Sequence, residues 1–170
     1  MEFAKLVWAR YSVRAYRSDP VEDSKLIEVL EAARAAPTAC NRQPFRVIVV
    51  RTQGREAELR RIYSKDWFVQ APLVIAACGV RSEAWTRKKD AKCYCEVDVA
   101  IMMDHLILGA ANAGLGTCWV AAFDPAAARE LLRLPDEVEP IAFTPLGYPA
   151  DKPATKVRKH RTEIVRWEHW

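Results

Sequence analysis

The segment from Asp98 to Ala113 constrains the fold most, because it is apolar on nearly every side of a helix. Four polar side chains interrupt it: Asp98, Asp104, His105 and Asn112. A helix that is hydrophobic all round belongs in a protein interior, so the rest of the chain is expected to pack around it. Gly114 and Gly116 are expected to end it. The segment is too short and too polar to cross a bilayer, so no membrane partner is expected.

Helical and strand patterns share the remainder of the chain without a regular βαβ rhythm. Amphipathic spacing predicts helices, and β-branched or continuous apolar runs predict strands. Helices are expected at Glu2–Ala9, between Pro20 and Pro37, at Glu56–Tyr63 and at Pro125–Leu134, and strands at Arg46–Val50, Pro72–Gly79, Cys118–Ala122 and Glu139–Pro149. With no repeat or linker, the sequence predicts a single α+β domain over residues 1–170, with an antiparallel or mixed sheet.

Charge and cysteine content exclude several classes of protein. Lysine and arginine number 26 against 22 acidic residues, and a net charge of +4 demands no nucleic-acid partner. Basic residues do gather in residues 10–17 and 156–161, which favours a small anionic ligand. The five cysteines lack the spacing of a disulfide framework, and no secretory signal is visible. We therefore expect reduced thiols and a cytoplasmic location.

Familiar catalytic motifs are missing. Residues 114–119 (GLGTCW) carry two of the three glycines of a dinucleotide-binding turn, but they follow a helix instead of a strand. The three histidines have no metal-ligand spacing, so no metal is expected. Cys93 and Cys95 form a CxC pair, which is more often incidental than redox-active. An enzyme built from these residues needs a borrowed cofactor.

Two polar pairs near the central helix allow a catalytic or a structural interpretation. Glu96 and Asp98 form a carboxylate pair, and charges that favour a helix N-terminus are the better interpretation. Asp104 and His105 could be an acid–base pair, but buried polar groups or groups at a subunit contact are favoured. No nucleophilic triad can be assembled, so no catalytic side chain is expected.

Four other segments carry a stronger signal together. In residues 10–16 (RYSVRAY), alternation in an extended chain points Arg10, Ser12 and Arg14 to one side, where guanidinium groups and a hydroxyl suit a phosphate or an electron-rich ring. Residues 36–45 (APTACNRQPF) offer amide donors and acceptors from Asn41 and Gln43, between two prolines. Either segment alone also fits an exposed strand or a capped turn.

The third segment, residues 114–124, has small residues that allow a flat ligand to approach the backbone. The fourth, residues 147–153 (GYPADKP), is followed by the second cationic group, Lys156 and Arg158. The chain then ends in an apolar stretch, residues 164–170 (IVRWEHW). A surface tail does not normally end in two tryptophans, so a partner subunit is expected to cover it.

These four segments, in this order, resemble the nitroreductase family of FMN-dependent flavoproteins, and the resemblance covers essentially the whole chain. It implies an α+β nitroreductase-like fold with a mixed, mainly antiparallel sheet flanked by helices. It also implies an intertwined homodimer with two FMN sites at the interface. The C-terminal segment, about residues 150–170, should wrap the partner subunit.

The resemblance also implies which residues bind the cofactor. Arg10, Lys156 and Arg158 should hold the FMN phosphate, Ser12 should lie near the phosphate or ribityl chain, and Arg14 near N1 and O2 of the ring. Pro37, Thr38, Ala39 and Asn41 of the opposite subunit should line the ring. Backbone amides around Ala121 and Ala122 should face N5. The full expected set is Arg10, Tyr11, Ser12, Arg14, Pro37, Thr38, Ala39, Asn41, Gln43, Ala121, Ala122, Lys156 and Arg158.

The implied activity is hydride transfer from NADH or NADPH to a small-molecule electron acceptor of nitroaromatic or quinone type, by a ping-pong mechanism at N5. A fixed Arg14 cation would stabilise negative charge on the reduced ring and so tune the flavin. Residues between Trp67 and Tyr94, including Trp85, should form the wall that selects the substrate. The alternatives are a flavin-binding redox protein with little turnover, and a specialised dehalogenase or dehydrogenase.

Overall fold

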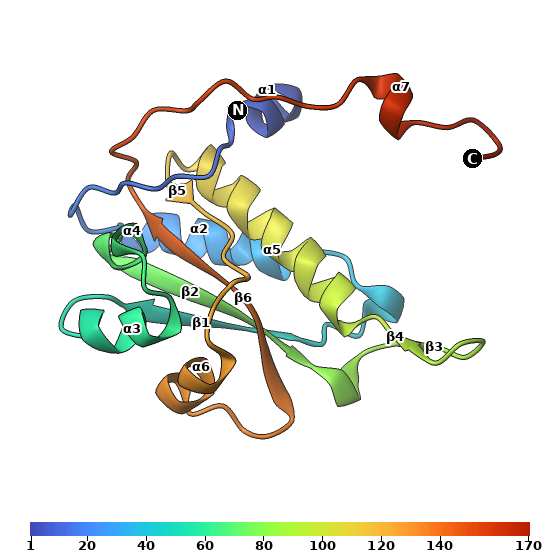
Figure 1. Ribbon diagram of the computed structural model, residues 1–170, viewed down its shortest axis with the longest axis horizontal. Coiled ribbons are helices and arrows are strands. Elements are labelled where there is room, and N and C mark those ends of the chain that lie inside the picture. Colours follow the sequence, from blue (N-terminus) through green and yellow to red (C-terminus); the bar gives the residue numbers. More distant parts are fainter.

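The computed structural model describes residues 1–170 and centres on a four-stranded sheet in the order β1-β2-β6-β5 (Figure 1). The strands are β1 (Phe45–Arg51), β2 (Leu73–Val80), β5 (Gly116–Thr117) and β6 (Val138–Gly147). All neighbouring pairs are antiparallel. The α+β class is confirmed, as are the expected strands at β1, β2 and β6.

Helices cover both faces of the sheet (Figure 1). One face carries α2 (Asp23–Arg34) and α5 (Cys95–Asn112), and the other carries α3 (Glu56–Ile62), α4 (Asp66–Gln70) and α6 (Pro125–Leu132). Strand β2 is buried at every position, with Leu73 and Ile75 in the core under α5 and Val74 and Ala76 in the core under α3 and α6. Its continuous apolar run reflects this position between two layers.

The central helix α5 begins three residues earlier than the pattern indicated and ends as expected. Gly114 has φ +77°, and the amides of Gly114 and Leu115 return to the carbonyls of Ala111 and Ala110 at 3.2 and 2.8 Å. Only Gly has ready access to this left-handed conformation, which explains the stop.

One face of α5 lies outside the core, so the expectation of complete burial is wrong for a single chain. Met102, Met103 and Leu106 are fully buried. By contrast, Val97 is exposed, and Ile101 and Leu108 are only partly covered. The exposed Asp104 stands between Ile101 and Leu108 on the same side, so this side of the helix is a mixed surface with partly uncovered apolar residues.

The expected strand at Cys118–Ala122 is wrong. Only Val120 makes a bridge, to Phe143, with backbone hydrogen bonds of 2.8 and 2.9 Å. The Cys118 amide donates to the Thr144 hydroxyl at 3.0 Å instead of continuing the ladder. This side-chain acceptor ends β5 at Thr117, earlier than the apolar pattern predicts.

Several short elements were not anticipated. They are α4, the hairpin of β3 (Thr86–Arg87) and β4 (Lys92–Cys93), and α7 (Arg161–Ile164), while α1 spans Phe3–Ala9 as expected. None of these unpredicted elements exceeds five residues, which is too short for periodicity to register.

The extended segment 10–17 is held between β5 and the end of β6. The Val13 amide donates to Thr117 at 2.9 Å, and the Arg17 amide donates to Tyr148 at 2.9 Å. Gly116 has no side chain because Val13 packs against it: a Cβ added there would lie 2.6 Å from Val13 Cγ2. The small residue expected to admit a flat ligand therefore admits this segment of the chain.

The C-terminal segment leaves the sheet after Gly147, runs past α1 and carries α7 away from the body (Figure 1). Trp167 and Trp170 are 87% and 103% exposed, and Val157 and Ile164 are also exposed. None of the helices is long and apolar enough to cross a membrane.

We predict that Gly116→Ala lowers the free energy of unfolding by about 1–3 kcal/mol, because the added methyl group overpacks against Val13. Urea denaturation measures the loss. In a Val13→Gly background the same substitution should cost much less, since the Val13 Cβ and both methyl groups that it would meet are gone. An equal cost in both backgrounds would contradict this account of the glycine.

Candidate functional site

The first group of expected site residues lies on one side of the segment 10–14. The best marker is the buried Cys118 thiol, whose pKa is raised by burial and lowered in part by Arg14, the Ser12 hydroxyl and Arg10. Val13, between Ser12 and Arg14, is buried against Gly116, whereas Arg14 is exposed. This pattern agrees with an extended segment whose alternate side chains point away from the core.

Three cations gather where this segment meets the C-terminal segment. Partial burial lowers the pKa of Lys156, and the neighbouring charges of Arg10 and Arg158 lower it further. No acidic side chain forms a salt bridge with any of the three, although eleven ion pairs form elsewhere. Uncompensated like charges repel, so a cluster of this kind favours an anion.

Lys156 has no free hydrogen-bond donor within this cluster. Its Nζ donates to the carbonyls of Val7, Trp8 and Arg10 at 3.1, 2.7 and 2.6 Å. An ammonium group has three donors, so all are engaged at the end of α1. Lys156 adds positive charge and fastens the C-terminal segment, while the Arg10 and Arg158 guanidinium groups have donors to spare.

Asp151 orders the same segment through two contacts. Its Oδ2 accepts from the Arg14 amide at 2.8 Å, and its Oδ1 and carbonyl oxygen accept from the Tyr11 hydroxyl at 3.1 and 2.9 Å. Burial and then the hydrogen bond to Asp151 raise the pKa of Tyr11 to about 12. The Tyr11 hydroxyl is therefore occupied by Asp151. The Arg14 guanidinium does not contact Asp151 and lies 6.0 Å from the Trp67 ring centroid.

Ala121 and Ala122 lie on an exposed stretch just after Cys118. Neither backbone N–H donates to another protein atom. These two backbone N–H groups are therefore free to donate a hydrogen bond. A contact to a ring nitrogen requires such a donor.

The second group of expected residues forms a tight loop before β1. The Gln43 amide donates to Thr38 Oγ1 at 3.0 Å, and Gln43 Nε2 donates to Asn41 Oδ1 at 3.1 Å. Cys40, Asn41 and Gln43 all have positive φ values, of 53°, 53° and 51°. Three left-handed residues that are not glycine store strain, which is typical of functional loops.

The two groups lie at opposite ends of α5. The loop is joined to the first turn of the helix by a 3.0 Å hydrogen bond from the Ala39 amide to Asp98 Oδ1. The segment 10–14 lies against residues 114–117, just past the other end. A helix of 18 residues is roughly 27 Å long, so one chain does not bring the two groups together.

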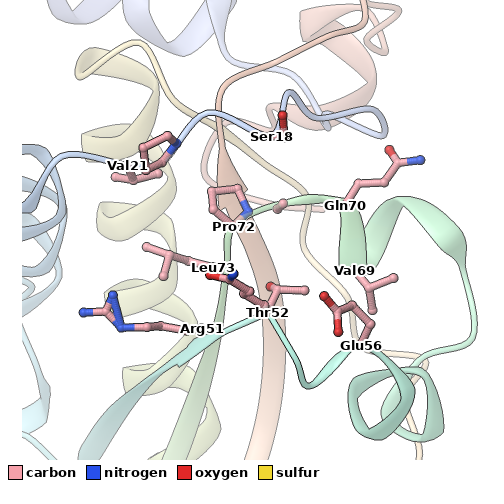
Figure 2. Close-up of a pocket in the computed structure, with 12 residues that line it drawn as sticks. Ser18, Val21, Arg51, Thr52, Glu56, Val69, Gln70, Pro72 and Leu73 are labelled. Carbon is pink, nitrogen blue, oxygen red and sulfur yellow. The ribbon is translucent and has the colours of Figure 1, made fainter.

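A groove of about 420 Å³ lies elsewhere, between residues 18–21, the end of β1 and the start of β2 (Figure 2). Thr52 is buried at its base, and Arg51 and Glu56 extend on opposite sides (Figure 2). None of the expected cofactor-binding residues lines it, although residues 69–73 belong to the stretch expected to form the substrate wall.

The side chains considered for other chemistry occupy structural positions. Burial, with the neighbouring Cys93 as a further cause, raises the pKa of the Cys95 thiol to about 11, which disfavours thiolate chemistry. His105 Nδ1 contacts the Ile101 carbonyl at 3.0 Å within α5. No group of three metal-ligating side chains converges. Glu96 is exposed and pairs with Arg81, whereas Asp98 is buried, a difference that spacing could not reveal.

Comparison with known proteins identifies the family. The model described as "Nitroreductase family" matches residues 7–65 and 55–148. The chain is 30% identical to an NADH dehydrogenase of Thermus thermophilus, over 93% of this chain and 92% of the relative. It is 28% identical to an FMN reductase (NAD(P)H) of Bacillus subtilis, over 92% and 70% respectively. The chain therefore belongs to the nitroreductase family.

A solved structure supports this assignment. A nitroreductase family protein from Clostridium difficile 630 superposes with a TM-score of 0.92 at 38% identity, covering 100% of both chains. A relative with a different printed activity, an iodotyrosine deiodinase of Thermotoga neapolitana, is 23% identical over 92% of this chain and 91% of its own.

Proposed function

We propose that this chain is an FMN-dependent oxidoreductase that takes hydride from NADH or NADPH and passes it to a small oxidised organic molecule. The observation that carries the proposal is the cluster of Arg10, Lys156 and Arg158, which has no acidic partner. Ser12 and Arg14 follow Arg10 along the same extended segment, which backbone hydrogen bonds from Val13 and Arg17 fix in place. This combination fits a ligand with a phosphate at one end and an electron-accepting ring at the other.

Each group has a separate task in this proposal. Arg10 and Arg158 bind the phosphate. Lys156 adds charge and holds the C-terminal segment against the end of α1. Arg14 lies at the edge of the ring that carries N1 and O2, and the free amides of Ala121 and Ala122 donate toward N5. FMN supplies the hydride chemistry, so no side-chain acid or nucleophile is required.

The complete site is proposed to need two chains. The loop 37–43 and the segment 10–14 lie at opposite ends of α5, and the outward side of that helix leaves Val97, Ile101 and Leu108 partly uncovered around Asp104. Two copies related by a two-fold axis along these faces would place the loop of one against the segment of the other. The exposed Trp167 and Trp170 would then wrap the partner subunit. The homodimer would thus have two identical sites.

The β3–β4 hairpin is proposed as part of the substrate wall, since it leads directly into the end of α5 that carries the loop. Trp85 packs edge-on against Tyr94 with ring centroids 5.1 Å apart, so its ring supports the hairpin. Nitroaromatic and quinone acceptors fit an open ring face bordered by such a wall. The reaction would be ping-pong, because donor and acceptor would use the same face.

The first test is an absorption spectrum of purified protein before and after anaerobic addition of NADH or NADPH. We expect near-stoichiometric FMN that bleaches within the mixing time and recovers on addition of a quinone. FMN that stays oxidised would contradict the hydride step and favour the low-turnover alternative. A protein that remains colourless after incubation with FMN would contradict the cofactor itself.

Arg14→Ala is expected to lower the FMN reduction potential by on the order of tens of millivolts, because a cation near the ring favours its reduced, negatively charged form. Turnover should slow in parallel. Potentials are measured by dye-coupled titration. Arg17→Ala is the matched control, since Arg17 pairs with Asp19 and stacks on Tyr148. Equal potentials for the Arg14 variant and the wild type would rule out this role.

Leu108→Glu is expected to yield a monomer that no longer retains FMN, because it replaces an apolar contact on the outward face of α5 with a second negative charge beside Asp104. Light scattering after gel filtration gives the mass, and the flavin absorbance gives occupancy. Ala126→Glu, on the exposed side of α6 beyond the sheet, is the control. A folded Leu108→Glu monomer with full FMN occupancy would contradict the shared site.

A further inference from the structure

We propose that Asp98 is the positioning residue of the loop 37–43 and sets the geometry with which this loop meets FMN. The inference rests on the proposed function, because it concerns that same site. Neither family membership nor the charge pattern assigns this role, and spacing alone favours a simple helix N-terminal charge for Asp98.

The carboxyl group of Asp98 is enclosed by protein. Its residue is 1% exposed, Oδ1 accepts from the Ala39 amide at 3.0 Å, and Oδ2 has no partner. A buried polar oxygen without a hydrogen bond costs free energy, so stability alone does not favour an acid here. The hydrogen bond from the Ala39 amide to Oδ1 is a better explanation for an acid at this position.

A helix-terminal charge does not require this burial. Glu96 stands two residues earlier in the same first turn, is exposed, and forms a 2.9 Å ion pair with Arg81. It meets the preference for acids at a helix N-terminus without loss of hydration. Asp98 is instead turned toward the loop, which requires a separate reason.

The loop depends on that contact. Within residues 38–43, the other hydrogen bonds are internal: the Asn41 amide to Thr38, the Arg42 amide to Ala39, and those of Gln43. The bond from Ala39 to Asp98 is the one that fixes these residues to the rest of the chain. Cys40, Asn41 and Gln43 have strained left-handed backbone conformations. The loop is therefore expected to relax if its hydrogen bond to Asp98 is lost.

The position of the anchor adds to its importance. Asp98 lies on α5, whose outward side is proposed to meet the partner subunit. A loop hydrogen-bonded to that helix would enter the partner's site at a position that the helix fixes. A loop held only by its covalent link to β1 would lack this constraint. The Asp98 carboxyl therefore transmits the placement of α5 to the residues that line the ring.

The main test is FMN affinity, measured by quenching of flavin fluorescence on titration into FMN-free protein. Asp98→Ala is expected to raise the Kd at least tenfold, and Asp98→Asn, whose carbonyl can still accept from Ala39, to stay within threefold of wild type. Glu96→Ala is the control, since it removes the exposed acid from the same first turn of the helix. An Asp98→Ala Kd equal to that of the control would overturn the proposal.

A double-variant cycle tests the bond itself. Ala39→Pro removes the donating N–H at the first residue of its turn, where proline is tolerated, and the extended Thr38 (φ −134°, ψ 158°) suits a following proline. If Asp98 acts through this bond, Asp98→Ala/Ala39→Pro should lose no more affinity than the worse single variant. Losses that multiply would overturn the proposal.

Hydrogen–deuterium exchange supplies a measurement that does not depend on FMN. In cofactor-free protein, peptides over residues 37–43 should exchange faster in Asp98→Ala than in Asp98→Asn, while peptides from β2 and β6 stay protected. Unchanged exchange in the loop would contradict the positioning role. A wild-type protein that binds no FMN would instead refute the proposed function, and the exchange experiment would still decide whether Asp98 holds the loop.

Discussion

Burial of α5 against β2 and β6 is the constraint on which the rest of the structure depends. Met102, Met103 and Leu106 fill the space above Ile75, Ala77 and Ala142, so neither the helix nor the strands can shift without loss of packing. A rigid helix roughly 27 Å long then fixes the separation of everything attached to its ends. The strained loop is attached at one end, and the cationic segment lies past the other.

The segment that carries Arg10 and Arg14 has no acidic partners for these side chains, but hydrogen bonds hold its backbone in place. Lys156 donates to three carbonyls at the end of α1, and Asp151 accepts from the amide of Arg14 without contacting its guanidinium. The backbone is thus held firmly while the arginine side chains keep their charge and donors. This arrangement separates fold stability from ligand binding: the main chain is satisfied by protein, and the guanidinium groups are left for an anion.

The sequence predicts those parts of the fold that depend on long periodic patterns. Strands β1, β2 and β6 and helices α2 and α5 follow from apolar spacing, and Gly114 marks the helix end. Where a tertiary contact intervenes, prediction fails: the Thr144 hydroxyl takes the Cys118 amide and ends β5. The charge of Lys156 was predictable, but its hydrogen bonds depend on where α1 ends. Likewise, spacing grouped Glu96 with Asp98, and only the fold shows that one is exposed and the other buried.

The loop 38–43 combines backbone strain with a binding site that one chain does not complete. Glycine would adopt the left-handed conformation of Cys40, Asn41 and Gln43 at lower cost, yet side chains are present at all three positions. The amide groups of Asn41 and Gln43 bond to each other and stiffen the loop, which compensates in part. Their remaining donors and acceptors face outward, where this chain offers nothing to meet them. Rigid polar groups presented at the end of a partly uncovered helix are suited to a site completed by a second subunit.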